Sequence, residues 1–188
     1  YKSTIITFAG ALQEIARDPE ITIGIFSHTK PTARKFLGQL KKEMESNREL
    51  QQTYPDIFWA DPKRQSPQWS EEKGLIVQRK GNPKEATIEA HGLVDGQPTG
   101  AHFLLRIYDD VVTLESVNTP EQVDKTTSAW ELSDNLGARG ASGLMRSWHV
   151  GTRYSFADTY QVIIDRKALK VRIYASTDNG LADGVPVF

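Results

Sequence analysis

The chain has 188 residues, of which 38% are hydrophobic, 9% aromatic and 25% charged, and its formal net charge is −1. This is typical of one globular domain, and it excludes an overall field that would draw the molecule to nucleic acid or membrane. The absence of cysteine excludes disulfides and thiolate metal sites, and the four histidines lack metal-ligand spacing. No apolar run approaches the roughly 18–20 residues of a membrane span and no signal peptide is evident, so we expect an intracellular soluble domain.

The first quarter of the chain predicts a helix, a strand and a second helix. Apolar residues recur with helical spacing over residues 3–17, and Asp18-Pro19 ends this helix because the residue before proline avoids the α region. The β-branched run 21–26 predicts a buried strand, and Pro31 suits the first turn of the next helix. This succession favours an α/β fold wound around a sheet.

In the rest of the chain the sequence signal for helices and strands is weak at first and then becomes regular. Residues 47–68 give a poor signal because prolines interrupt them. A helix is predicted from Thr119, as its cap, through about residue 135, and a short one over 157–165. Glycine and aspartate dominate from Thr177, so we divide the chain into a domain at 1–176 and a linker at 177–188. Further strands are predicted at 74–77, 86–90, 103–108, 144–150 and 171–175.

The tripeptide Lys2-Ser3-Thr4 stands directly before the first predicted helix. A P-loop binds phosphates through backbone N–H groups and a helix N-terminus, while its lysine reaches the terminal phosphates and a Ser or Thr hydroxyl binds Mg²⁺. These three residues fit the second half of such a loop. Taken alone they are better explained as a helix cap, since serine and threonine favour that position.

An acidic pair, Asp109-Asp110, follows the buried run 103–108. A carboxylate at the end of a core strand can hold Mg²⁺ opposite a P-loop, and a second one can orient or deprotonate the attacking water. Alone, the pair is better explained as a solvated turn. Together with Lys2-Ser3 it favours a nucleotide site, because both motifs are expected at the same edge of one sheet.

A third polar motif, His149-Val150-Gly151-Thr152, ends the next predicted strand. Thr152 can sense the γ-phosphate or the water, and Gly151 permits close approach of the backbone. His149 is better explained as a packed or surface histidine than as a general base. Three arginines are candidates for stabilising phosphate charge, although each is more simply a surface residue: Arg79, Arg146 and Arg153.

With these motifs in this order, nearly the whole chain resembles the ATPase domain of the large terminase of tailed bacteriophages. Lys2-Ser3-Thr4 resembles the end of the family's Walker A motif. Residues 107–111 resemble the Walker B motif of podophage-type members, which carry Asp-Asp where others have Asp-Glu. Gly151-Thr152 is similar to the coupling motif. Two further segments are similar to the family, namely the Ser-x-Thr stretch at 26–29 and the stretch 86–92 that precedes Walker B.

The resemblance implies an α/β P-loop NTPase of the RecA-like type, a three-layer sandwich with a mostly parallel sheet. It implies an ATP-hydrolysing motor that moves double-stranded DNA into a viral procapsid in the host cytoplasm. ATP and Mg²⁺ are the implied cofactors. The implied partners are DNA, the portal protein, the small terminase subunit and further copies of the chain in a ring, with no membrane.

The resemblance also assigns roles to individual residues. Lys2 would contact the β- and γ-phosphates, and Ser3, less plausibly Thr4, would bind Mg²⁺ together with Asp109. Asp110 would activate water, with Glu115 a weaker candidate. Thr152 would couple the nucleotide state to DNA movement.

The sequence departs from the family in three ways, the first of which is that the second Walker B acid is Asp110 rather than the commoner Glu, and it leaves other functions open. The strand and glycine loop expected before Lys2 are not in the sequence, and the metal-binding acids of the family's nuclease have no counterpart, so no nuclease activity is expected. One alternative is a helicase-type nucleic-acid translocase, which would share the acidic pair but need a second lobe. Another is a non-catalytic α/β interaction module in which all three motifs are turns.

Overall fold

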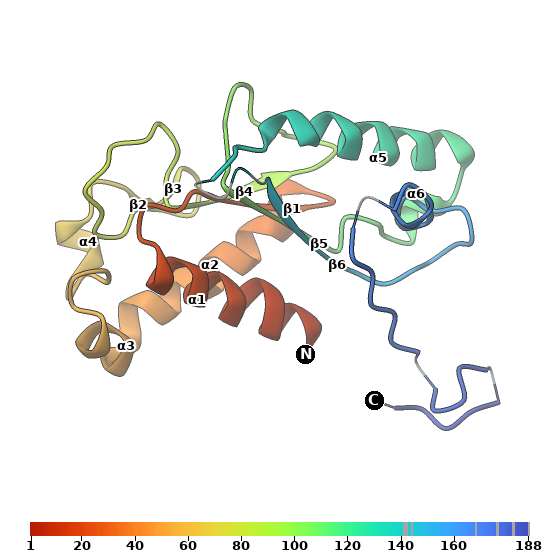
Figure 1. Cartoon of the computed structure of the whole chain (residues 1–188), viewed down its shortest axis with the longest axis horizontal. Helices are drawn as coiled ribbons and strands as arrows, with labels where there is room; N and C mark the ends of the chain where they lie inside the picture. Colours follow the sequence, from red (N-terminus) through yellow and green to blue (C-terminus); the bar gives the residue numbers. More distant parts are fainter. Residues whose placement is uncertain (141–142, 144, 168, 176, 182, 188) are drawn as a thin grey trace.

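The protein is built around a single mixed sheet. The computed structural model describes residues 1–140, 143, 145–167, 169–175, 177–181 and 183–187. Six strands lie in the order β2-β3-β4-β1-β5-β6 (Figure 1). Four neighbouring strands are parallel, namely β4 (Ile88–Gly92), β1 (Ile23–Ser27), β5 (Leu105–Asp109) and β6 (Arg146–Val150). At one end the sheet continues antiparallel through the short strands β3 (Gly74–Leu75) and β2 (Trp69–Ser70).

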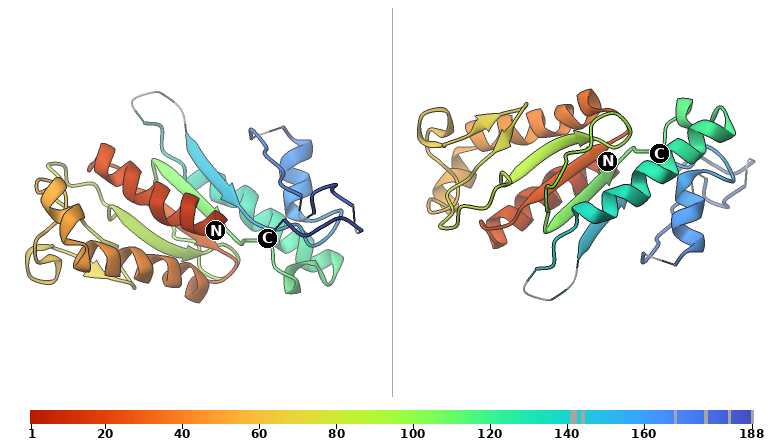
Figure 2. Two further views of the ribbon diagram at one scale, coloured as in Figure 1. Left: turned by 90° about the horizontal axis from the view of Figure 1, so that it is seen from below. Right: turned by 90° about the horizontal axis from the view of Figure 1, so that it is seen from above.

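Helices cover both faces of this sheet (Figures 1 and 2). One face carries a π-helical segment, η1 (Thr4–Gly10), continued by α1 (Ala11–Arg17), and the long helix α2 (Lys30–Ser46). The opposite face carries α5 (Pro120–Ser133) and α6 (Thr159–Asp165). The short elements are α3 (Arg48–Thr53), α4 (Pro62–Gln65), η2 (Glu115–Val117) and η3 (Asp134–Leu136). The predicted α/β class with a mostly parallel sheet is therefore confirmed.

Each central strand contributes side chains to two hydrophobic cores. Ile23 and Ile25 of β1 belong to the core under α1 and α2, whereas Phe26 belongs to the core under α5 and α6. In β5, Ile107 and Tyr108 divide in the same way. Strands covered on both faces are nearly continuous apolar runs, which is why these strands were recognisable in the sequence.

The predicted helices are confirmed, with one difference in geometry. Residues 3–17 form a helix that begins as the π-helical η1, where Gly10 lies against the indole ring of Trp148. A Cβ at Gly10 would lie 3.0 Å from that ring, so glycine permits this close packing. Thr119 caps α5 as expected, since its side chain accepts a hydrogen bond from the backbone N–H of Gln122 at 3.3 Å.

The predicted strands are confirmed in the centre of the sheet and wrong near the carboxyl end of the chain. The predicted strand at 74–77 is reduced to Gly74–Leu75, and of the predicted strand at 144–150, Leu144 lies outside the described residues. Residues 171–175 form no strand, because they pair with no strand among the described residues. Their apolar side chains are exposed, including Ile173 at 76% and Tyr174 at 78%.

Candidate functional site

The three predicted motifs meet at the carboxyl edge of the parallel sheet. Lys2 Nζ donates to the Thr152 hydroxyl at 2.5 Å, and the Ser3 hydroxyl donates to Asp109 Oδ1 at 2.9 Å. β5 and β6 are parallel neighbours, with Asp109 beside Val150 in the register. The expectation that the ends of these strands lie side by side, with Lys2 at the same edge, is therefore confirmed.

The first helix brings Lys2 and Ser3 to this edge. It runs back along β6, because Gly10 packs on Trp148 and Glu14 accepts a hydrogen bond from Arg146 Nη1 at 2.8 Å. Arg146 opens β6 at its amino end, so the start of the helix lies at the carboxyl end of the strand. Parallel α/β proteins place their ligands at this edge, where helices begin and strands end.

Asp109 is the centre of the site. Its side chain is fully buried, and its two oxygens accept hydrogen bonds from the hydroxyls of Ser3 and Thr7. Burial raises the pKa of the Asp109 carboxyl, and the charge of Asp110 adds to this, whereas the two hydroxyls and Lys2 act in the opposite direction. A buried carboxylate whose hydrogen-bond partners are neutral hydroxyls keeps its negative charge uncompensated, so a cation there would be favourable.

Asp110 is held beside Asp109 by an unusual backbone conformation. Its φ of 49° lies in the left-handed region, which aspartate tolerates better than most residues. The backbone N–H of Asp110 donates to the carbonyl of Val150 at 3.0 Å, and its carbonyl accepts from the N–H of His28 at 3.4 Å. The half-buried Asp110 is thus fixed between the ends of β1 and β6.

Thr152 stands on a turn that depends on Gly151. A Cβ at Gly151 would overlap the hydroxyl of Tyr160, which donates to the carbonyl of Val150 at 3.2 Å. Burial raises the pKa of Tyr160, and the charge of Asp110 contributes. The buried tyrosine of α6 therefore holds the end of β6 in position, and the exposed Thr152 projects beside Lys2.

The other residues that the sequence suggested as candidates lie at different positions relative to the carboxyl edge of the sheet. Thr4 and Glu115 are exposed, on η1 and η2 respectively. Arg146 lies at the amino end of β6, and Arg79 bonds the carbonyl of Glu85 near the amino end of β4, so neither arginine lies at the edge of the sheet that holds Asp109 in the same chain.

Arg153 is adjacent to Thr152 but is engaged in its own loop. Its guanidinium lies 3.3 Å from Asp158, and it donates to Gln161 at 2.7 Å. The carbonyls of Ser155 and Phe156 each accept from it at 3.0 Å. Arg153 is thus the one predicted arginine at the site edge, where it stabilises the loop after β6.

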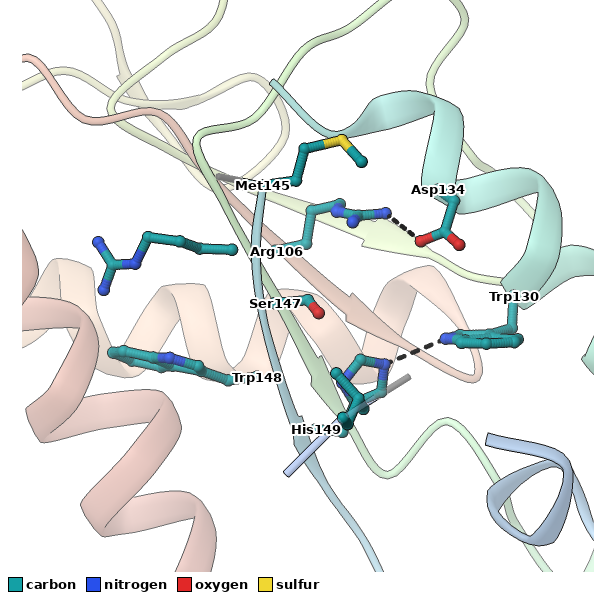
Figure 3. A pocket seen from close by; sticks show the side chains of 9 residues that line it. Arg106, Trp130, Asp134, Met145, Ser147, Trp148 and His149 are labelled. Atoms are coloured by element: carbon teal, nitrogen blue, oxygen red, sulfur yellow. Dashed lines mark hydrogen bonds and ion pairs between the residues drawn. The ribbon is translucent and has the colours of Figure 1, made fainter. Parts of the chain in front are cut away.

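His149 lies on the opposite face of the sheet from Asp109. Its ring stacks on Tyr108 at 4.4 Å between centroids, and its Nε2 accepts from Trp130 Nε1 at 3.1 Å. Burial lowers the pKa of His149 to about 3, so the ring is neutral near pH 7. The prediction of a packed histidine is confirmed, and Figure 3 shows this contact.

Two residues of the site were not predicted from the sequence. Thr7 contacts Asp109 directly, and its place one helical turn after Ser3 was an available signal. Ser27 ends β1 beside Asp109, and its recognition requires the strand register. Among the described residues no group of three or more His, Cys, Asp or Glu side chains could hold a metal. Mg²⁺ commonly needs one or two carboxylates, with water and phosphate oxygens supplying the rest.

A cavity of about 370 Å³ lies away from these residues, along β6. Arg106, Trp130, Trp148 and His149 are among its lining residues (Figure 3). Arg106 is already engaged there, since its guanidinium lies 2.8 Å from Asp134. The cavity follows an edge strand of the sheet and does not include Asp109, Asp110 or Thr152.

No protein-family model matches the chain, and no curated protein matches it. Within the described part of the chain, no helix has the length and apolar character needed to cross a membrane.

Proposed function

We propose that the protein is the ATP-hydrolysing domain of a DNA-packaging motor of the large-terminase type. The observation that supports this is the convergence of Lys2, Ser3, Asp109 and Thr152 at one carboxyl edge of a parallel sheet. Four side chains from three distant segments share two hydrogen bonds there. Turns that serve structure alone have no need of this convergence, which argues against the non-catalytic module.

The residues present fit a magnesium ion. Asp109 offers a buried carboxylate and Ser3 a hydroxyl within 2.9 Å of it, both hard oxygen ligands. Bound at this position, Mg²⁺ would supply positive charge to the phosphates of ATP. Lys2 adds a second positive charge and would orient the β- and γ-phosphates from the start of η1, where backbone N–H groups favour anions.

Asp110 would act on the attacking water. A carboxylate next to the metal residue can accept the water's proton or align its lone pair. The Thr152 hydroxyl can donate or accept a hydrogen bond at the same edge of the sheet. Loss of the γ-phosphate would therefore change the contacts of this hydroxyl. Its link through Gly151 and Val150 to Tyr160 connects the site to α6, which is the proposed route from nucleotide state to movement.

A P-loop fold predicts where a preceding strand would lie. The helix formed by η1 and α1 starts at the carboxyl edge and packs back over β6, as a crossover helix does. A strand leading into Lys2 would pair with the outer edge of β6, the last strand of the described sheet. Its carboxyl end would carry the glycine loop to Lys2.

The proposed partners follow from the motor rather than from this site. Double-stranded DNA, a portal, a small terminase subunit and further copies in a ring are proposed on the terminase resemblance. With a net charge of −1, DNA contact would be local or shared between copies. A helicase-type translocase would use the same edge of the sheet. An assay of DNA packaging into procapsids, with and without this protein, distinguishes the two functions, because only the packaging motor is required for it.

Substitution of the two acids tests the catalytic assignment in the full-length protein. Asp110→Asn should leave ATP binding near normal and lower turnover by roughly 10²-fold or more, as loss of a general base does. Asparagine also tolerates the left-handed backbone of position 110, so the turn should persist. Asp109→Asn should instead weaken binding of Mg-ATP, because it removes the charge that opposes the metal.

Nucleotide-binding and steady-state ATPase assays separate these effects. Asp124→Asn, on the exposed surface of α5, makes the same change of charge away from the site and should behave as the unsubstituted protein. Near-normal turnover in both Asp109→Asn and Asp110→Asn would contradict the proposal and favour the non-catalytic module.

A further inference from the structure

We propose that Ser27 is an additional residue of this site, where its hydroxyl holds a water molecule of the hydration shell of Mg²⁺ at Asp109. This inference rests on the proposed function. Ser27 is the last residue of β1, its side chain is fully buried, and its Oγ has no hydrogen-bond partner among the described residues. An unpaired buried hydroxyl is costly, so it indicates a group that pairs with something the protein binds.

The strand register places Ser27 beside Asp109. Ile25 pairs with Ile107 and Phe26 with Tyr108, so the next residues along β1 and β5 are Ser27 and Asp109. Neighbouring strands lie about 4.8 Å apart, which brings the two side chains close without joining them directly. The structure records hydrogen bonds to both Asp109 oxygens from Ser3 and Thr7.

The two side chains also share a face of the sheet. Side chains alternate along a strand, and Ile25 and Ile107 both enter the core under α1 and α2. Ser27 and Asp109, two residues further on, therefore point toward η1 as well. Thr7 of η1, which contacts Asp109 there, confirms the direction for β5.

On the other side of β1, the carboxylate that lies near the strand partner of Ser27 already accepts a hydrogen bond. Gly92 of β4 pairs with Ser27, and the space that a Cβ of Gly92 would fill is taken by the carboxylate of Asp95. Asp95 accepts a hydrogen bond from the backbone N–H of Lys30 at 3.1 Å, at the start of α2. The carboxylate of Asp109 is thus the group beside Ser27 that is suited to a metal.

A bridging water explains why the hydroxyl is buried at this position. Mg²⁺ gives up its water reluctantly and keeps several molecules when it is bound by one carboxylate. The Ser27 hydroxyl can accept from one of these waters and so fix its orientation, while Ser3 serves as the direct protein hydroxyl. Ser27 is then a positioning residue, because it acts on metal and nucleotide through the water.

The test measures the coupling between Mg²⁺ and ADP in the full-length protein. Titration calorimetry gives the dissociation constant of ADP with EDTA and with Mg²⁺, and the ratio of the two is the coupling. Ser27→Ala should lower this ratio about two- to twelvefold, the range expected for one hydrogen bond, and leave ADP affinity in EDTA unchanged. Thermal stability without metal should not fall, because the substitution removes an unpaired group.

Two control variants separate a specific role of Ser27 from the general effect of losing a buried hydroxyl. Ser133→Ala removes a buried hydroxyl that bonds Tyr108 on the other face, so it should lower stability but keep the coupling. Asp109→Asn should abolish the coupling. Unchanged coupling in Ser27→Ala, or a loss that Ser133→Ala reproduces, would overturn the role of Ser27 alone. Absence of coupling in the unsubstituted protein would overturn this role together with the proposed function.

Discussion

At the scale of single residues, burial of the Asp109 carboxylate costs free energy of folding that its contacts within the protein do not offset. The carboxylate is fully buried and hydrogen-bonded by Ser3 and Thr7, and the positive charge of Lys2 makes the smallest of the contributions to its pKa. A buried ionised group with neutral partners destabilises the folded state. Residues of this kind persist where a ligand supplies the missing charge, which agrees with the proposed metal role.

The pH dependence of stability should report this cost. Because the pKa of Asp109 is raised in the folded state, the folded chain binds this proton more tightly than the unfolded chain. Stability from this group is therefore present below the unfolded pKa of about 4 and lost as pH rises through the folded value. Without metal or nucleotide, Asp109→Asn should gain in thermal midpoint relative to the unsubstituted protein as pH rises from about 4 to 7.

Asp124→Asn is the matched control for this measurement, since it changes an exposed aspartate on α5. Its difference from the unsubstituted protein should stay constant over the same pH range. A constant difference for Asp109→Asn as well would contradict burial of the carboxylate as the cause of the raised pKa.

The residues of the site differ in how far the sequence could reveal them. Lys2, Asp109 and Thr152 stand directly at the ends of apolar runs or helices, so chain position was enough to predict their common edge. Thr7 follows Ser3 by one turn and could have been inferred from helical spacing. Ser27 belongs to the Ser-x-Thr stretch that resembles the family, but its position beside Asp109 could not be predicted, because it depends on which strands pair with each other.

At the scale of elements, the packing of β6 against α5 depends on a neutral histidine. The ring of His149 lies between Tyr108 and the indole of Trp130, whose N–H must find an unprotonated Nε2. Nδ1 then carries the ring proton, and it is buried with no partner among the described residues. A second proton would break the Trp130 bond and place a charge in this core.

Acid should therefore loosen this interface. The folded pKa of His149 is lowered to about 3, so the unfolded chain binds the proton more tightly, and stability present above the unfolded pKa of about 6.5 is lost as pH falls toward 3. The loss should reach up to about 1.4 kcal/mol per pH unit. In His149→Gln, which keeps an acceptor for Trp130, denaturant unfolding at pH 5 and pH 7 should show a smaller difference.

The exposed His102 provides the comparison, because His102→Gln replaces an imidazole ring outside β6 in the same way. It should retain the full difference between pH 5 and pH 7. If His149→Gln retained that difference too, acid sensitivity would have another source than the contact with Trp130.

The pattern of apolar residues predicted the central strands but not which strands pair with each other. Continuous apolar runs marked β1 and β5 because both faces of these strands are covered. The alternating run 171–175 has the same β propensity, yet its side chains are exposed, because a strand also needs a neighbour for its backbone hydrogen bonds. The short strand β2 was not predicted, since it spans two residues, and of the strand predicted at 74–77 only the two residues of β3 pair.

At the scale of the whole molecule, the sheet ends in an unpaired position where the proposed P-loop strand would lie. β6 is the last strand of the described order, and the cavity of about 370 Å³ follows it. Two apolar side chains are exposed at Ile5 of η1 and at Met145, which directly precedes β6. Addition of a parallel strand would satisfy the outer backbone groups of β6 and extend both cores.

If the proposed function holds, these 188 residues alone should bind ATP poorly, whereas a protein that also carries the proposed strand and glycine loop before Lys2 should bind it tightly. A P-loop binds phosphates mostly through backbone N–H groups before its lysine, and in this structure the Lys2 ammonium is engaged with the Thr152 hydroxyl. Calorimetric titration with Mg-ATP should show no tight site on the 188 residues and one on the longer protein. Lys2→Ala in the longer protein should remove that site, and Lys125→Ala, on the exposed surface of α5, should not. Micromolar binding by the 188 residues alone would show that the nucleotide pocket lies elsewhere.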